Sequence, residues 1–294
     1  MKRLKQIFLA FLISIQAFSI PSYAKELPDT TIYAYYNALN TDDRVLYTQV
    51  LDNFNLLNSK IKIKGNYQIT DIKRIINSVL YDHPEIFWVS TRYSCEIKSS
   101  GKVVSINFEY LFSGSELNAA KNYFDTVTEA IVKNAKSLDT TEEKERFIAD
   151  SVMEITTYAT DNLSSPIYQT AYSAVCNKVT VCTGYAKLFS YLCNQVDIPT
   201  FIVTGSSDIE SHAWNVVYID GAFKNVDLTT EDQIIELAKE TLNSSANTKN
   251  IKLSDIDLDI MYNITDKEFN DYWARGGTYY ARSDLSKAAI PACE

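Results

Sequence analysis

Hydrophobic and polar positions in the first third of the chain change their period once. Up to residue 80, apolar residues recur at three- and four-residue spacing, which predicts helices, and after residue 85 they form short runs that predict strands. The predicted elements are helices at 41–57 and 70–80, strands at 86–89, 93–97 and 103–110, and a turn at 99–102. We expect a small α+β domain at residues 25–113, in which the sequence shows no evident chemistry.

Small polar residues at Ser113-Gly114-Ser115-Glu116 mark the start of a second part of the chain. Ser115 and Thr140 precede acidic residues and apolar periodic runs, so we expect each to cap a helix that packs behind a third helix. Beyond Asp232 the pattern weakens. The predicted elements are helices at 115–136 and 140–158, a third helix from residue 182, a polar loop at 243–248 and a short helix from residue 264.

The third helix begins with a cysteine, Cys182. Its predicted buried face consists of residues at helical spacing, namely Tyr185, Leu188, Phe189, Leu192 and Val196. Unpaired backbone N–H groups and the positive end of the helix dipole at this position favour a thiolate over a thiol. Gly184 leaves the first turn bare on one side, which would let a substrate or another strand approach closely.

Two later segments predict a hairpin around Asp220-Gly221, a strong two-residue turn signal between apolar runs. Pairing outward from this turn places Trp214 opposite Asp227. The same register places His212 opposite Thr229. Because side chains alternate faces along a strand, His212 and Asp227 share a face as diagonal neighbours, near enough for the carboxylate to accept the imidazole N–H. The order nucleophile, base and orienter is the logic of cysteine acyl-transfer enzymes.

These segments resemble the transglutaminase-like superfamily, and more narrowly its exported bacterial branch, over roughly residues 140–232. The resemblance is carried by Ala171-Tyr172-Ser173-Ala174-Val175, Val181-Cys182-Thr183-Gly184-Tyr185-Ala186, Ile198-Pro199, Val203-Thr204-Gly205, His212-Ala213-Trp214-Asn215 and Val226-Asp227-Leu228-Thr229. It implies an α+β fold, with a papain-like core at residues 114–294 in which the nucleophile helix packs on an antiparallel sheet.

The resemblance also implies a role for individual residues. Cys182 is the implied nucleophile, His212 the implied base and Asp227 the implied orienter. An upstream polar residue helps to bind the oxyanion in similar enzymes, which makes Tyr172 a candidate for that role, with core packing as the alternative. Trp214 is expected to form either a wall of the cleft or part of the core.

Two positions depart from the family pattern. Asp227-Leu228-Thr229-Thr230 stands where such domains usually carry an aspartate, a threonine and a tryptophan together, so we expect that edge of the cleft to differ. Cys176 stands where a small or apolar residue is more usual, and the sequence offers no functional account of it.

Residues 1–24 have the composition of a secretory signal peptide. Three positive charges precede an apolar run from Ile7 to Ile20, and Ser22-Tyr23-Ala24 suits cleavage before Lys25. The apolar run is short for a membrane span, and no later span follows it. The expected protein is therefore secreted or associated with the cell surface, with a mature chain that begins at Lys25.

Composition narrows the classes of partner. The chain has 294 residues, 46% of them apolar, and a net charge of −9, which becomes −12 once the three positive charges of the first segment are removed. Such an acidic surface argues against nucleic acid and anionic lipid as partners, and tolerates a cationic or neutral substrate. The length suits one large core or two modest ones, and we expect two.

Five cysteines are too few for a disulfide scaffold in a chain of this length. Cys193 lies nearly on the helical face of Cys182, three turns later, and is expected to be a small core residue rather than a second nucleophile. Spacing leaves open whether it pairs with Cys176. It also leaves open whether Cys293 pairs with Cys95.

Metal sites are the weaker interpretation of the remaining titratable residues. A zinc site of Cys182, His212 and Asp227 lacks a fourth ligand motif in a chain with two histidines. Asp82-His83-Pro84-Glu85 is better explained as the end of a helix, since a residue before proline leaves helical geometry. We therefore predict no metal and no cofactor.

The sequence predicts an exported cysteine-nucleophile enzyme that acts on amide bonds of protein or peptide, with cell-wall peptide as one candidate substrate. Hydrolysis of the thioester is favoured over transglutaminase crosslinking, because no second aromatic residue beside Asp227 indicates a closed tunnel. The alternative is a catalytically silent binding or adhesion module of the cell envelope. A blocked cleft or a Cys182 of ordinary reactivity would favour that alternative.

Overall fold

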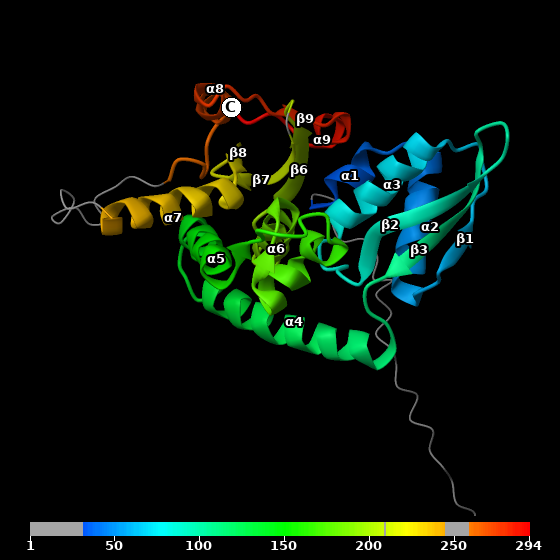
Figure 1. Ribbon diagram of the computed structural model, residues 1–294, viewed down its shortest axis with the longest axis horizontal. Helices are drawn as coiled ribbons and strands as arrows, with labels where there is room; N and C mark the ends of the chain where they lie inside the picture. The colour runs from blue at the N-terminus through cyan, green and yellow to red at the C-terminus, as the bar shows by residue number, and fades with distance from the viewer. Residues whose placement is uncertain (1–31, 209, 245–258) are drawn as a thin grey trace, which may run out of the picture. The chain divides into compact units, whose positions relative to one another are not determined.

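The computed structural model describes residues 32–208, 210–244 and 259–294 (Figure 1). The predicted signal peptide at residues 1–24 and its cleavage point at Lys25 lie outside the described residues. In the described ranges, no helix is long and apolar enough to cross a membrane.

Residues 34–110 combine helices with a small antiparallel sheet of strand order β1-β3-β2. The elements are α1 (Ala34–Ala38), α2 (Thr41–Leu56), β1 (Lys60–Lys62), α3 (Ile69–Asp82), β2 (Val89–Ile97) and β3 (Val103–Tyr110). This confirms both predicted helices and the hairpin. The separate strand predicted at 86–89 is wrong, because Ile86, Phe87 and Trp88 precede β2 and insert their side chains into the core.

From residue 114 onward, helices surround a second antiparallel sheet. The elements are α4 (Gly114–Ala135), α5 (Thr141–Ile155), β4 (Thr157–Tyr158), a 3-10 turn (Pro166–Gln169), a π-helical turn (Ser173–Asn177), β5 (Val179–Thr180), α6 (Cys182–Asn194), β6 (Thr200–Ser206), β7 (Ser211–Ile219), β8 (Ala222–Val226), α7 (Leu228–Ser244), α8 (Asp266–Arg275), β9 (Ala281–Arg282) and α9 (Asp284–Ala289).

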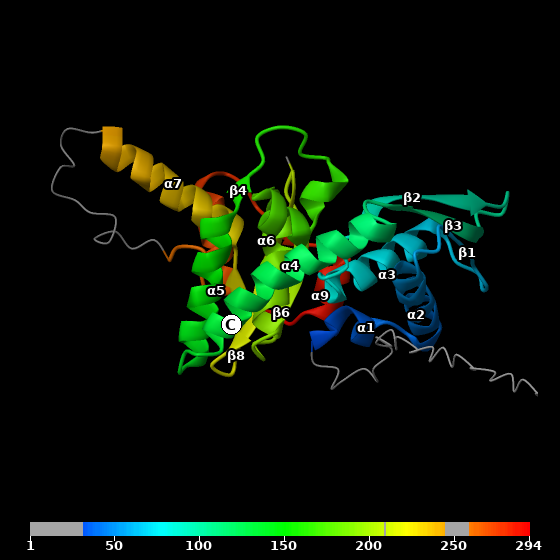
Figure 2. The same ribbon diagram turned by 90° about the horizontal axis from the view of Figure 1, so that it is seen from below.

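The second sheet carries the helix that begins with Cys182. Its strand order is β8-β7-β6-β9, with antiparallel neighbours throughout, and α6 packs against β6 and β7. On its other side α6 contacts α4 and α5, the two helices that precede it in the chain (Figure 2). This confirms the predicted α+β class, in which a nucleophile helix packs on an antiparallel sheet.

Three local predictions are corrected by the backbone. Ser113, not Ser115, is the residue that precedes α4. The helix predicted at 140–158 ends at Ile155, because the β-branched pair Thr156-Thr157 leads into β4, which pairs in parallel with β5. The polar loop predicted at 243–248 begins inside α7, and the rest of it lies outside the described residues.

The hairpin has the predicted turn but a shorter second strand. Asp220 and Gly221 both have positive φ, 52° and 77°, as a two-residue hairpin turn requires. The predicted pairing of His212 with Thr229 is wrong, because β8 ends at Val226 and Thr229 lies in the first turn of α7. The strand stops there because the Asp227 side chain accepts from the backbone N–H of Thr230, a contact that starts α7.

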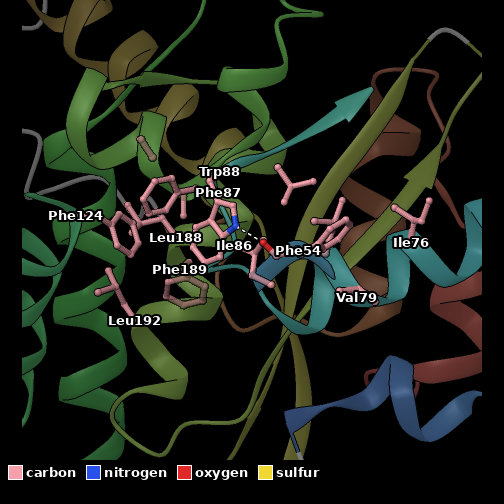
Figure 3. Close-up of a cluster of buried hydrophobic side chains, with 14 of the residues drawn as sticks. Phe54, Ile76, Val79, Ile86, Phe87, Trp88, Phe124, Leu188, Phe189 and Leu192 are labelled. Atoms are coloured by element: carbon pink, nitrogen blue, oxygen red, sulfur yellow. Dashed lines mark hydrogen bonds between the residues drawn. The ribbon is translucent and has the colours of Figure 1, made fainter. Parts of the chain in front are cut away.

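One buried cluster joins the two parts of the chain that the sequence separates. It includes Phe54, Ile76 and Val79 from the first part and Leu188, Phe189 and Leu192 from α6, with Ile86, Phe87 and Trp88 between them (Figure 3). Trp88 Nε1 also donates a hydrogen bond of 2.9 Å to the carbonyl oxygen of Phe54. Residues 31–294 form one compact unit, and the domain boundary at 113/114 stays a prediction.

Candidate active site

Cys182 is the first residue of α6 and is half-buried. The residue before it, Val181, is extended, so the chain turns sharply into the helix at the thiol. A Cβ atom on Gly184 would overlap the hydroxyl of Thr180 and lie 3.0 Å from the carbonyl oxygen of Thr170. The close approach that the sequence predicted at Gly184 is therefore made by β5 and a neighbouring loop of the same chain.

His212 and Asp227 come together as the alternation along the hairpin predicted. His212 lies on β7, and its Nε2 is 2.7 Å from Oδ2 of Asp227, whose side chain is 0% exposed. Thr230 holds the same carboxylate: its hydroxyl donates to Oδ2 at 2.8 Å and its backbone N–H donates to Oδ1 at 3.2 Å. Thr230 thus orients Asp227, at the edge where the sequence departs from the pattern of the domains it resembles.

The electrostatics of His212 favour its protonated form. Burial alone would lower the pKa of the imidazole, but the charge and hydrogen bond of Asp227, with smaller contributions of the same kind from Cys182, raise it to about 10. At neutral pH the ring is therefore an imidazolium. Because Nε2 is taken by Asp227, the ring nitrogen left for the Cys182 sulfur is Nδ1.

Aromatic rings surround this imidazolium. Trp214 stacks on it at a centroid distance of 6.0 Å, Tyr280 lies at 5.2 Å, and Trp273 meets it edge-on at 6.2 Å. Trp214 is 2% exposed and donates Nε1 to Oδ1 of Asn225 at 3.0 Å, so it is a core residue behind His212 and not a lining residue of the cleft. The face of an aromatic ring favours a neighbouring cation, so the stacked Trp214 supports the charged form of His212.

Sequence reasoning missed Trp273 and Tyr280, because no motif accompanies them. Their only signal was compositional: aromatic residues crowd a short stretch near the end of the chain. These are Phe269, Tyr272, Trp273, Tyr279 and Tyr280.

Tyr172 is not brought to the thiol. Its ring stacks on Phe87 at 4.8 Å and meets Phe112 at 4.9 Å, and it does not line the cavity that contains Cys182. The predicted oxyanion role of Tyr172 thus gives way to the alternative, core packing, since two neighbouring aromatic rings hold it in the hydrophobic cluster.

Tyr158, unlike Tyr172, lines the cavity beside Cys182. Its hydroxyl hydrogen-bonds the backbone N–H of Cys182, and burial first, followed by the charges of Cys182 and Glu210, raises its pKa to about 12. It therefore stays a neutral donor at physiological pH. Sequence reasoning missed this residue because its strand, β4, is two residues long, and the predicted helix at 140–158 included it.

A cavity of about 810 Å³ opens beside these groups. Cys182, His212, Tyr158 and Tyr81 all line it, so the thiol is accessible and the cleft is not blocked. The walls come from elements far apart in the sequence: α3, α6, β6, β7 and the start of α9.

The remaining cysteines, Cys95, Cys176, Cys193 and Cys293, have raised pKa values. All five cysteines are free thiols, so neither pairing left open by the sequence is formed. Burial raises the pKa of Cys176 to about 12 and that of Cys293 to about 11, and it also raises the pKa of Cys193 and Cys95. Within the described residues, no group of three His, Cys, Asp or Glu side chains is placed to hold a metal ion.

Part of the chain matches a known protein family. Residues 125–228, which include Cys182, His212 and Asp227, match the model of the transglutaminase-like superfamily. No curated protein matches the chain.

Solved structures with a related arrangement are distant in sequence. A crystal structure of a TGase is 12% identical, with a TM-score of 0.34, over 58% of this chain and 50% of that one. A candidate cysteine protease from Cytophaga hutchinsonii is 17% identical, with a TM-score of 0.31, over 47% of this chain and 61% of that one. A candidate protease from Parabacteroides distasonis is 9% identical, with a TM-score of 0.29, over 48% and 40%. The chain thus spans less than two thirds of the length of each.

Proposed function

The chain is a transglutaminase-like superfamily protein, matched at residues 125–228, and on that premise we propose that it is a cysteine-nucleophile acyl-transfer enzyme. The observation that carries the proposal is the position of the His212 ring, which bonds Asp227 through Nε2 and interacts with the Cys182 sulfur at the start of α6. Three side chains in this order form a nucleophile, a base and an orienter.

In the first step, the Cys182 sulfur attacks the carbonyl carbon of a substrate amide, and the carbonyl π electrons move to oxygen. His212 holds the proton that left the thiol, and Asp227 stabilises the resulting imidazolium. The carbon–nitrogen bond then breaks, the imidazolium gives its proton to the departing amine, and a thioester of Cys182 remains.

The oxyanion of this step lies at the start of α6. The backbone N–H of Cys182 points from a helix N-terminus, and the Tyr158 hydroxyl is its immediate neighbour. We assign the negative oxygen to the Tyr158 hydroxyl, whose oxygen accepts from the Cys182 N–H and whose O–H can donate to the substrate. A donor placed before the reaction stabilises the developing charge without reorganisation.

In the second step, water or an amine attacks the thioester, and His212 accepts a proton from the attacking group. We favour water. Thr230 stands where an aromatic residue would cover the thioester, and its side chain is directed to Asp227. Trp273 and Tyr280 pack on His212 but do not line the cavity, so neither of them screens the thioester from solvent.

A partition experiment tests the reaction. The chain from Lys25 onward is incubated with a glutamine-containing peptide or a cell-wall peptide, with and without a labelled primary amine. We expect release of the free acid to exceed incorporation of the amine. Faster amine incorporation would make the protein a crosslinking transglutaminase. Absence of both products, together with an unreactive Cys182, would assign it to the binding modules of the cell envelope.

Export is the second element of the proposal and rests on the sequence of residues 1–24. The measurement is mass spectrometry of the protein from its native cell envelope or culture medium. A new N-terminus at Lys25 is the expected result, and an uncleaved chain that stays in the cytoplasm would reject export.

A further inference from the structure

One wall of the cavity beside Cys182 comes from α3, outside the residues that match the transglutaminase-like family. The α3 side chains that line the cavity recur at the spacing of one helix face: Thr70, Lys73, Arg74, Asn77 and Tyr81. Between them lie buried apolar residues, among them Ile72 and Ile75, that anchor the helix in the core. The first part of the chain thus presents a mainly polar helix face to the site of reaction.

Tyr81 fixes the position of this wall relative to the nucleophile. Its ring packs against the same small apolar cluster as Cys182, and its hydroxyl hydrogen-bonds the side chain of Thr204. Lys73 precedes Tyr81 by eight residues, which at ~1.5 Å of rise per residue places it about 12 Å away along the helix axis. An extended peptide advances about 3.3 Å per residue, so this distance corresponds to about four substrate residues.

The two cationic side chains on this face differ in their ion pairs. Arg74 is already paired: Nη1 lies 2.8 Å from Oδ2 of Asp43, and Nη2 lies 3.5 Å from Oδ1 of Asp71. Lys73 is exposed and forms no ion pair with any residue in the described ranges. A carboxylate that enters the cavity along α3 would therefore find its cationic partner in Lys73.

We propose that the α3 wall selects peptide substrates with an acidic residue about three to four residues from the scissile amide, and that Lys73 binds its carboxylate. The inference deepens the function proposed above and rests on it. It is compatible with the net charge of −12 expected for the chain from Lys25 onward, because charges elsewhere on the surface are screened beyond about 8 Å in physiological salt. Glu210 and Asp284 on the other cavity walls add to the selection, since they repel an acidic residue placed there.

Binding to the Cys182→Ala protein tests the inference without requiring turnover. The probes are fluorescein-labelled peptides of glycine and alanine with one central glutamine, in which a single glutamate is moved from position to position. We expect the Kd to be lowest when glutamate lies three or four residues from glutamine on one side. An exposed ion pair contributes enough for about a threefold gain over the alanine peptide. A Kd independent of the glutamate position would overturn the inference.

Charge reversal supplies the matched comparison. Lys73→Glu should remove the preference for glutamate and create one for lysine at the same peptide position, while Lys98→Glu, an equal charge change on the exposed hairpin turn, should leave the preference unchanged. An unaltered preference in Lys73→Glu would reject the role of Lys73. If the neutral peptide is turned over by wild-type protein and the charge preference is absent, only this inference fails; if peptides bind with the preference but never react, only the proposed enzyme function fails.

Discussion

The carboxylate of Asp227 accepts hydrogen bonds from both the His212 imidazole and the first turn of α7. Oδ2 accepts from His212 Nε2, and Oδ1 accepts from the backbone N–H of Thr230 in the first turn of α7. The carboxylate therefore starts a helix while it orients an imidazole, and its complete burial strengthens both hydrogen bonds. A substitution at this position can separate the two tasks, because asparagine keeps the accepting oxygen that the helix needs.

We predict that Asp227→Asn lowers kcat/KM by about a hundred- to ten-thousandfold, because the amide favours the wrong imidazole tautomer. Circular dichroism should show that the domain stays folded. Asp232→Asn is the control, since Asp232 lies on α7, the helix that directly follows Asp227, and accepts from the Tyr185 hydroxyl at 2.7 Å. Equal activity of Asp227→Asn and wild type would contradict the role of Asp227.

The same variant has a pH-dependent effect on stability. The pKa of His212 is raised to about 10 in the folded protein, against about 6.5 in an unfolded chain. The His212–Asp227 pair therefore stabilises the fold fully below about pH 6.5 and loses this contribution as the pH rises through about 10. We expect the Tm deficit of Asp227→Asn to be largest near pH 6 and to vanish above pH 10. A deficit that grows with pH would have the wrong sign.

Tyr158 allows a second prediction at the scale of the residue. Removal of its hydroxyl in Tyr158→Phe should lower kcat by about a hundred- to thousandfold with little change in KM, as expected for a donor that acts on the transition state. Tyr172→Phe is the matched control, because the Tyr172 ring packs in the core and should keep its activity. Loss of activity in Tyr172→Phe with none in Tyr158→Phe would restore the oxyanion role to Tyr172.

The sequence could place His212 beside Asp227 because a two-residue turn determines the register of a hairpin and alternation determines the face. It could not place Tyr158, because a strand of two residues has no period, and its position depends on pairing with β5 across the chain. A residue's position can thus be predicted from sequence when the residue belongs to a long periodic element, and cannot when its element is only two residues long.

At the scale of the element, the first turn of α6 is closely packed against β5. Gly184 permits this contact, because any larger residue would collide with Thr180, and the contact sets the position of Cys182 at the start of the helix. The helix itself was predictable from its long apolar face. The identity of its neighbour was not, because β5 is two residues long and the π-helical turn before it has no recognisable sequence pattern.

We predict that Gly184→Ala destabilises the protein by about 1–3 kcal/mol, the usual cost of overpacking, and also displaces Cys182. The new Cβ would lie 2.9 Å from the Cβ of Thr180 and overlap its hydroxyl. Gly276→Ala is the control, because its nearest atom would be 3.5 Å away. Thermal unfolding and activity assays measure the two effects, and a fully stable, fully active Gly184→Ala protein would contradict the packing described here.

For the whole chain, the buried cluster is continuous between the two parts that the sequence separates. The change in hydrophobic period near residue 85 correctly marked where helices give way to strands, but it could not show that α3 also packs near β6 and lines the cavity. Contacts of this kind depend on which helix faces meet, and a single sequence records only that each face is apolar.

Unfolding should consequently occur in one cooperative transition. Ile75 from α3 and Leu188 from α6 are both completely buried in the shared cluster. We expect Ile75→Ala and Leu188→Ala each to cost about 2–5 kcal/mol and to lower the same single transition in calorimetry. Two transitions, each sensitive to only one of these substitutions, would show instead that residues 31–113 unfold independently.

The central claim is that His212 activates Cys182, and the rate of alkylation by iodoacetamide at pH 6 tests it most directly. Peptide mapping can follow Cys182 beside Cys95 and Cys176, which are also partly exposed. We predict that Cys182 is labelled well ahead of both in the wild type, and that His212→Ala reduces its rate toward theirs. Labelling of Cys182 at the rate of Cys95, unchanged in His212→Ala, would contradict the account.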